Sequence, residues 1–346
     1  MACIGMTVFS AEVWKRFSLP SMAHFLGFGG YVPERIMTND DWSQLLDTSD
    51  EWITQRTGIK RRRIAAPDET TLTLARDAAV VAIEDASLGA GDIDEIILAT
   101  DTPEMYTPDT AALLQESLEC RNIPTYDLGG SGCAGFVQAL DIARARIAFE
   151  PKRILVVGVE LLTRMIDWKD RSTAVLFGDG AGAVVLGPGP GRGHLLDVVA
   201  GTEGRYAGIL TLASGGTRNP FNELTLASGD YNRVIMDGRR VFTEAVRRMS
   251  EASAQVLEKI GKGVSDVALV IPHQANLRII DAVRKRMGLA EDQVYVNVDE
   301  YGNTGSATVP FALYEAIGNG RVKDGDLVVL TAFGAGFHWA AAAVQF

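Results

Sequence analysis

The strand-like and helix-like segments of this chain follow an order that repeats at an offset of about 170 residues. Three segments of the first half have a counterpart of the same kind in the second: 96–100 and 268–271, the loops DLGGSGCAG (127–135) and DEYGNTGSA (299–307), and 154–160 and 327–333. Any α/β chain contains chance echoes, but three at nearly one offset favour an internal duplication. Because a pseudo-twofold axis would relate the two halves, we expect the two glycine-containing loops to face each other.

Apolar runs rich in Ile, Leu and Val alternate with helix-like segments, which predicts an α/β protein with largely parallel, buried strands. The strand candidates are 95–100, 124–128, 153–159 and 174–177, and the helix candidates are 71–86, 109–118 and 133–149. The run GPGPGRG (187–193) is the best candidate for a junction. We therefore expect an N-terminal tail (1–21), a first half (22–187) and a second half (188–346).

Composition limits the classes of function. A content of 47% hydrophobic residues over 346 residues is enough for a large core, and the net charge of −11 argues against a general nucleic-acid binder. The three cysteines (Cys3, Cys120 and Cys133) have no paired spacing, so we expect reduced thiols and no metal cluster. No apolar run is long enough for a membrane span, and the N-terminus lacks the order of a secretory signal. These features predict a cytoplasmic protein.

Cys133 is a candidate nucleophile. It stands in GSGCAGF, where an apolar strand ends and a long helix is expected to begin. The helix macrodipole would lower the thiol pKa and favour the thiolate, and the glycines would let a substrate approach the backbone. The alternative is an inert, small core residue, which is the usual role of a free cysteine.

Two polar residues of the second half are candidates to act with it. His273 follows the apolar run VALVI at the start of a helix, the position that Cys133 has in the first half. Asn303 lies in YGNTG, the loop that corresponds to the Cys133 loop, although such a sequence is usually only a turn. Of the other histidines, His24 and His194 are expected to be structural, and His338 is a weaker candidate.

Several segments together resemble one family. They are TSDEWITQRTGI, CAGF, DRSTAVLFGDGAGA, PHQANLRII, YGNTGSATVP and FGAGFHW. In this order they look like β-ketoacyl-acyl carrier protein synthase III, the initiating condensing enzyme of type II fatty-acid synthesis, from about residue 23 to the C-terminus. The resemblance implies a thiolase-like fold: an internally duplicated, five-layered α-β-α-β-α arrangement with two mixed sheets.

The resemblance also implies a catalytic triad of Cys133, His273 and Asn303 and a two-stage reaction. Cys133 would first take an acyl group from acyl-CoA, with the backbone N–H groups of Cys133 and Ala335 holding the oxyanion. His273 and Asn303 would then stabilise the enolate formed when malonyl-acyl carrier protein loses CO₂, beside the apolar wall of Phe333. Ala335 replaces a usual glycine, which a backbone donor tolerates if its φ does not require glycine.

Substrate contacts follow from the same resemblance. Coenzyme A would be a substrate and not a bound cofactor, with Trp52 and Arg171 around the adenine, Asn276 at the pantetheine, and Arg56 with the run KRRR (60–63) at the phosphates. The helix after His273 would dock the acidic carrier protein through Arg278, Lys285 and Arg286. The family also implies a homodimer.

Two departures from the family pattern affect the site. The loop from Asp127 to Cys133 looks one residue longer than usual, and Thr107 stands where some relatives have a bulky aromatic residue, which suggests a roomier acyl pocket. The glycines of GDGAGA predict a tight strand-to-strand turn and not a dinucleotide loop. Four alternative functions are a condensing enzyme of a polyketide-type pathway, acyl transfer to an alcohol or amine, a cysteine hydrolase, and a non-catalytic partner of the carrier protein.

Overall fold

The strands form one mixed sheet with two parts. The computed structural model describes residues 21–346, so the predicted tail lies almost wholly outside the described residues. The sheet has nine strands in the order β11-β12-β13-β8-β1-β7-β6-β4-β5. Within the described residues, its two parts are joined where β1 pairs with β8, at His24 with His194 and Phe25 with Gly193.

The first part contains the parallel strands β5, β4 and β6, followed by the antiparallel strands β7 and β1. The bounds are β1 (His24–Tyr31), β4 (Glu95–Thr100), β5 (Thr125–Gly129), β6 (Ile154–Leu161) and β7 (Asp179–Gly187). The second part pairs β11 with β12 in parallel and continues antiparallel through β13 to β8. Its bounds are β8 (Gly193–Thr202), β11 (Leu269–Pro272), β12 (Leu327–Gly334) and β13 (His338–Gln345).

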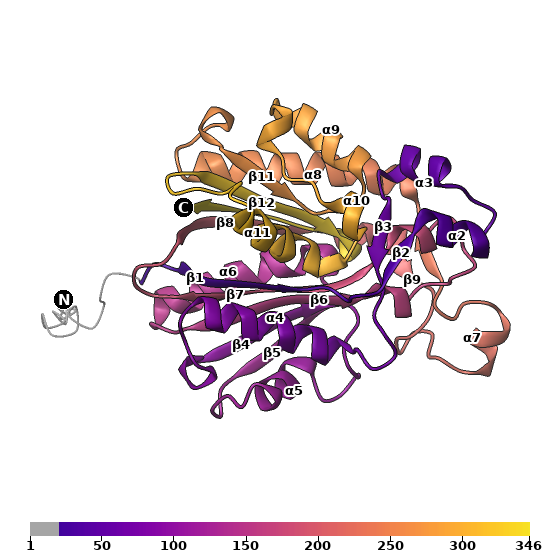
Figure 1. Ribbon diagram of the computed structural model, residues 1–346, viewed down its shortest axis with the longest axis horizontal. Coiled ribbons are helices and arrows are strands. Elements are labelled where there is room, and N and C mark those ends of the chain that lie inside the picture. The colour runs from indigo at the N-terminus through magenta and orange to yellow at the C-terminus, as the bar shows by residue number, and fades with distance from the viewer. Residues whose placement is uncertain (1–20) are drawn as a thin grey trace, which may run out of the picture.

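Helices cover both parts and separate them, which gives five layers (Figure 1). The outer helices of the first part are α4 (Thr71–Asp85) and α5 (Thr110–Ser117), and those of the second are α8 (Gly238–Lys259) and α9 (Leu277–Met287). Between the two parts lie α6 (Gly135–Phe149) and α11 (Thr308–Gly318), whose apolar side chains form the central core. A helix that is apolar on most sides suits this middle layer, because both its faces are buried.

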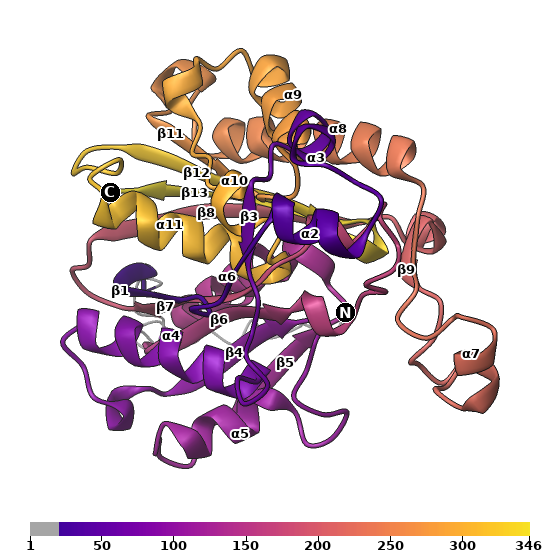
Figure 2. The same cartoon turned by 45° about the vertical axis from the view of Figure 1, so that its right-hand side comes forward.

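The remaining elements lie near one end of the molecule. They are β2 (Ile36–Thr38), α2 (Asn39–Leu45), α3 (Asp50–Thr57), β3 (Arg61–Arg63), β9 (Leu210–Leu212), α7 (Glu223–Ala227), β10 (Val234–Met236) and α10 (Val298–Tyr301). Figure 2 shows α7 at the tip of an arm that projects from the body beyond β9. No helix within residues 21–346 combines the length and the apolar character needed to cross a bilayer.

The five-layered, duplicated α/β fold is confirmed, although the two expected mixed sheets are joined into one through β1 and β8. The expectation of largely parallel strands is wrong, because three of the eight strand pairings described in this sheet are parallel and five are antiparallel. Two local predictions are also wrong. Residues 174–177 are not a strand, because Ala174–Leu176 form a 3-10 turn. GDGAGA is not a turn but lies in β7, where a Cβ at Gly182 would come within 2.5 Å of the Phe311 nitrogen of α11. The motif therefore allows a helix to pass close to a strand. The run 187–193 connects β7 to β8, where the chain passes from one part of the sheet to the other, and the division into halves there stays a prediction.

Candidate active site

Cys133 lies where β5 is connected to α6. A short 3-10 turn, Gly132–Ala134, carries it, and α6 begins directly afterwards at Gly135. The thiol lines a cavity of about 1990 Å³, which His273 and Asn303 also line. The structure therefore brings the three predicted side chains to one cavity, although they come from both halves of the chain.

Two glycines bring the nucleophile loop against the end of β12. A Cβ at Gly132 would lie 2.3 Å from the Ala335 nitrogen, and a Cβ at Gly334 would lie 2.3 Å from the Cys133 nitrogen. Real Cβ atoms are not found so close to backbone atoms, so both positions require glycine. The result is that the N–H groups of Cys133 and Ala335 lie close together at the cavity wall. Ala335 itself has no positive φ, so its side chain is tolerated where glycine is usual.

Asn303 is held rigidly by its backbone and by its side chain. Its backbone pairs with the segment 174–178: its N–H donates to the Leu176 carbonyl oxygen at 2.9 Å, and its carbonyl oxygen accepts from the Gly178 nitrogen at 3.0 Å. Its Oδ1 accepts from the Gly305 nitrogen at 2.8 Å. Because Oδ1 is engaged there, the amide N–H group is left to face the Cys133 thiol, whose ionised form it favours.

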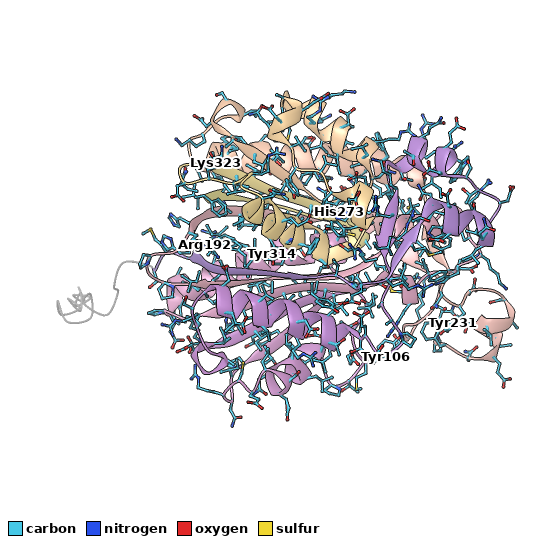
Figure 3. All side chains as sticks on the ribbon, in the orientation of Figure 1. Tyr106, Arg192, Tyr231, His273, Tyr314 and Lys323 are labelled. Atoms are coloured by element: carbon cyan, nitrogen blue, oxygen red, sulfur yellow. The ribbon has the colours of Figure 1, made fainter. Side chains whose placement is uncertain are left out.

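His273 follows β11 and is buried. Figure 3 shows it among the elements of the second half. Its Nδ1 lies 2.6 Å from the Thr308 hydroxyl, which is also 3.0 Å from the Gly305 carbonyl oxygen. The Thr308 hydroxyl can donate one hydrogen bond. If it donates to Nδ1, the imidazole carries its own proton on Nε2; if it donates to the Gly305 carbonyl oxygen, Nδ1 carries the imidazole proton and donates to the hydroxyl. Burial lowers the pKa of His273 to about 3, so the imidazole is neutral at ordinary pH.

The prediction of a lowered pKa for the Cys133 thiol is wrong. Burial is the largest influence and raises the pKa, and the negative charges of Asp101 and Glu160 raise it further. Its own backbone N–H and the Asn303 side chain act in the opposite direction and do not compensate. The free thiol is therefore protonated at neutral pH, despite its place at the start of a helix.

Three of the four residues expected at coenzyme A lie at the mouth of the cavity. Trp52, Arg56 and Asn276 line it, and the guanidinium groups of Arg56 and Arg171 lie 4.3 and 4.8 Å from the Trp52 ring centre. Asn276 also caps α9, where its Oδ1 accepts from the Arg278 nitrogen at 2.8 Å. The mouth thus combines an aromatic face with guanidinium groups.

The run KRRR (60–63) makes several structural contacts, and the predicted role at the phosphates is wrong for Arg62, because that residue is buried. Arg62 is fully buried and donates to the Asn39 side chain and the Val175 carbonyl oxygen. Lys60 and Arg61 pair with Asp299 and Glu300, just before the Asn303 loop.

Arg278, Lys285 and Arg286 lie on α9, whose opposite face is buried. Arg278 lines the cavity mouth, Lys285 pairs with Asp281, and Arg286 pairs with Glu251 of α8. The exposed face of α9 is therefore basic and adjoins the cavity, as the predicted docking role requires.

Phe333 lines the cavity and packs edge-on against Phe337. Thr107 is exposed and does not line the cavity, whereas its neighbour Tyr106 does. Tyr106 lies close to the arm that carries Tyr231 (Figure 3). His338 bonds Thr202 outside the site, and His24 stacks on His194 where the two parts of the sheet meet.

Sequence reasoning missed Asp101, Glu160 and Thr308. Asp101 directly follows β4, and Glu160 is the last residue but one of β6. Because the carboxyl ends of neighbouring parallel strands meet at one edge of a sheet, these positions were a usable signal. Thr308 starts α11 and gave no signal, because its partner His273 is distant in sequence. Within residues 21–346, no three His, Cys, Asp or Glu side chains come together as a metal site would require.

Profiles of one family match both halves of the chain. The profile described as 3-oxoacyl-[acyl-carrier-protein (ACP)] synthase III matches residues 126–204, and that of its C-terminal domain matches residues 257–346. The β-ketoacyl-[acyl-carrier-protein] synthase III of Symbiobacterium thermophilum is 49% identical over 321 residues, which cover 92% of this chain and 96% of that protein. The protein of the same name from Caldanaerobacter subterraneus is 45% identical over 324 residues, covering 93% and 97%.

Solved structures agree with these relatives. The 3-oxoacyl-[acyl-carrier-protein] synthase III of Aquifex aeolicus has a TM-score of 0.85 and 42% identity, covering 94% of this chain and 100% of that one. The priming β-ketosynthase of the R1128 polyketide pathway has a TM-score of 0.86 at 36% identity, covering 94% and 97%. Similar in sequence and fold over nearly its whole length, this chain belongs to the β-ketoacyl-[acyl-carrier-protein] synthase III family.

Proposed function

We propose that Cys133, His273 and Asn303 catalyse the decarboxylative Claisen condensation of an acyl-CoA primer with malonyl-acyl carrier protein. As a member of its family the chain is a condensing acyltransferase. The observation that carries the assignment is the convergence of a thiol, an imidazole, an amide and two backbone N–H groups on one cavity. No other described cysteine competes, because Cys120 is buried away from that cavity.

In the first step the Cys133 sulfur attacks the thioester carbonyl of acyl-CoA. The carbon–sulfur bond to coenzyme A breaks, and the proton that leaves the thiol ends on the sulfur of coenzyme A. The N–H groups of Cys133 and Ala335 donate to the oxyanion, and removal of one such donor typically costs about 10²–10³ in rate. Coenzyme A therefore leaves as a product and is not a resident cofactor.

In the second step malonyl-acyl carrier protein loses CO₂, and the electron pair of the broken bond forms an enolate. The Asn303 amide and the Nε2–H tautomer of His273 stabilise its oxygen, while Phe333 makes the wall apolar and favours CO₂ over the carboxylate. The enolate carbon attacks the acyl-cysteine, the carbon–sulfur bond breaks, and the thiolate takes a proton from solvent. The Thr308 hydroxyl selects the required tautomer when it donates to Nδ1.

The two substrates approach from the same side of the molecule. Trp52, Arg56, Arg171 and Asn276 contact coenzyme A at the cavity mouth. The basic face of α9, with Arg278, Lys285 and Arg286, docks the carrier protein, whose phosphopantetheine arm then reaches Cys133. Thr107 is assigned no contact within one chain, because it lies outside the cavity wall.

We further propose that the enzyme works as a cytoplasmic homodimer. Strand β5 ends the sheet and has no second partner strand within the described residues, and its Tyr126 is exposed. An edge of this kind is a natural pairing site for a second copy. Sedimentation of the purified protein measures the state directly, and a monomer at micromolar concentration would contradict this part of the proposal.

Intact-protein mass spectrometry after exposure to a panel of acyl-CoAs tests the function. The expected result is one acyl mass on Cys133, absent in Cys133→Ala and unchanged in the matched control Cys120→Ala. Addition of malonyl-acyl carrier protein should then discharge the acyl group with release of CO₂ and a β-ketoacyl product. Discharge to an alcohol or amine without malonyl would instead identify the simple acyltransferase.

The identity of the primer separates the two pathways that the fold allows. The likeness to the priming β-ketosynthase of the R1128 polyketide pathway is the observation that keeps a secondary-metabolite role open. A single short primer loaded much faster than all others supports initiation of fatty-acid synthesis. Preference for an unusual starter supports the polyketide-type role.

A further inference from the structure

Two carboxyl groups lie between the loop that carries Cys133 and the loop that carries Asn303. Asp101 follows β4, Glu160 lies near the end of β6 with 0% of its surface exposed, and both line the cavity. Neither has a role in the reaction proposed above. Their neighbours show what each one holds.

Asp101 holds the nucleophile loop. Its Oδ1 accepts from the Gly132 nitrogen at 3.3 Å, one residue before Cys133, and the Gly130 nitrogen also faces the carboxylate and favours its ionised form. This loop contains Gly129, Gly130 and Gly132, and it is the segment that looks one residue longer than the family pattern. A loop so rich in glycine needs fixed contacts to present a side chain in one position, because glycine restricts the backbone least.

Glu160 holds both Asp101 and the second loop. Its two oxygens accept from the Asp101 nitrogen at 3.1 Å each, and Oε2 accepts from the Thr102 hydroxyl at 2.8 Å. Oε1 also accepts from the Ser306 nitrogen at 3.4 Å, while the Ser306 hydroxyl donates to the Gly132 carbonyl oxygen at 3.0 Å. The contacts therefore run from Asp101 through Glu160 and Ser306 back to the nucleophile loop.

The pair carries one negative charge near neutral pH. Burial raises the pKa of both carboxyl groups, and the charge of Asp101 helps to raise the pKa of Glu160 to about 8. Because the charge of Asp101 raises the pKa of Glu160, Asp101 is the member that ionises first, and Glu160 keeps the proton. The ionisable groups that face Cys133 are these two and the neutral His273. The rest of the cavity wall carries the charged side chains Arg56, Glu104, Asp109, Asp127, Arg164, Arg218, Arg239 and Arg278.

We propose that Asp101 is a positioning residue for Cys133: its carboxylate fixes the glycine-rich loop that presents the thiol and places a negative charge beside that thiol. The proposal rests on Cys133 being the nucleophile. It explains how an enzyme with an extended nucleophile loop keeps the Cys133 N–H beside that of Ala335. The charge of Asp101 also adds to burial, which is the larger influence, in raising the pKa of the thiol.

The test compares the alkylation of Cys133 by iodoacetamide as a function of pH in the full-length wild type and three variants. Asp101→Asn keeps an oxygen that accepts from Gly132 but removes the charge, Asp101→Ala removes both, and the double variant D101N/E160Q leaves the pair uncharged at every pH. Asp179→Asn is the matched control, because Asp179 is a buried carboxylate with backbone partners outside the cavity. Peptide mass spectrometry separates Cys133 from Cys120.

We expect the alkylation profiles of D101N and the double variant to move to lower pH. For each pH unit by which the profile moves, Cys133 should react about tenfold faster at neutral pH. Asp101→Ala should slow acyl loading by about 10–100-fold with little change in KM for acyl-CoA, whereas D101N keeps most of the loading rate. The control should lose thermal stability without moving the profile.

The proposal would be overturned if the alkylation profiles of the wild type, D101N and the double variant superimposed. It would also be overturned if folded D101A took up the acyl group as fast as the wild type does. If Cys133 of the wild type were not acylated by any acyl-CoA, that result would instead refute the proposed function. The two failures are therefore distinguishable, because one concerns the variants and the other the unaltered enzyme.

Discussion

The close approach of Gly334 to Cys133 gives a sharp prediction for Gly334→Ala. The new Cβ would lie 2.3 Å from the Cys133 nitrogen, whereas an ordinary contact is 3.4–4 Å, so one of the two backbones must move by about 1 Å. The oxyanion donors act only at hydrogen-bond distance from the developing charge. Loss of one donor raises the barrier by about 2.7–4 kcal/mol, so we expect acyl loading to slow by about 10²–10³.

Single-turnover mass spectrometry measures this loading rate directly. The matched control is Gly204→Ala, because a Cβ at Gly204 meets nothing within 4 Å and the residue has no positive φ. G204A should load at the wild-type rate. Circular dichroism and the thermal midpoint show whether G334A is folded. A folded G334A that is acylated as fast as the wild type would refute the view that this contact forms the oxyanion site.

Three further predictions concern other parts of the site. Thr308→Val removes the hydroxyl 2.6 Å from His273 Nδ1, and we expect condensation to slow by about tenfold while acyl loading is retained; recovery in Thr308→Ser would attribute the loss to the hydroxyl. Lys285→Glu reverses a charge on α9, so KM for malonyl-acyl carrier protein should rise severalfold, less so at high salt, with acyl-CoA loading unchanged. In the unfolded state His273 takes up a proton below a pH of about 6.5, whereas in the folded state its pKa of about 3 keeps it neutral. Lowering the pH between these values therefore favours the unfolded state, and the free energy of unfolding of the wild type relative to His273→Gln should fall by about 1.4 kcal/mol per pH unit. Urea unfolding at several pH values measures this slope.

The fold could be predicted because its strongest signals are local. The apolar run 95–100 is β4 at the predicted bounds, and the helix expected over 71–86 is α4 within one residue. The short run 174–177 failed because four apolar residues fit a turn as well as a strand. GDGAGA failed because glycine favours turns in general, and only the packed structure reveals that α11 crosses this strand closely.

The convergence of Cys133, His273 and Asn303 on one cavity was predictable from the sequence, but the electrostatics around them was not. The end of an apolar run and the start of a helix located Cys133 and His273, and the duplication located Asn303. The macrodipole argument for a lowered thiol pKa considered the helix alone. Burial and the charges of Asp101 and Glu160 have the larger effect, and both depend on contacts between strands that are far apart in sequence.

The duplication also explains how one fold supplies different chemistry on its two sides. The turn Gly132–Ala134 before α6 corresponds to Gly305–Ala307 before α11, and Gly132 and Gly305 share a φ of 56°. The residue that corresponds to Cys133 is Ser306, which is buried and donates to the Gly132 carbonyl oxygen. In the second loop, Ser306, at the position equivalent to Cys133, therefore binds the first loop. Asn303, three residues earlier, lines the cavity. Because the two turns have the same backbone, the division between nucleophile and enolate stabiliser depends on the side chains. Ser306→Ala should therefore weaken the presentation of Cys133 without removing any group that contacts substrate, and a loss of acyl loading in this variant, with KM for acyl-CoA unchanged, is the measurement that checks it.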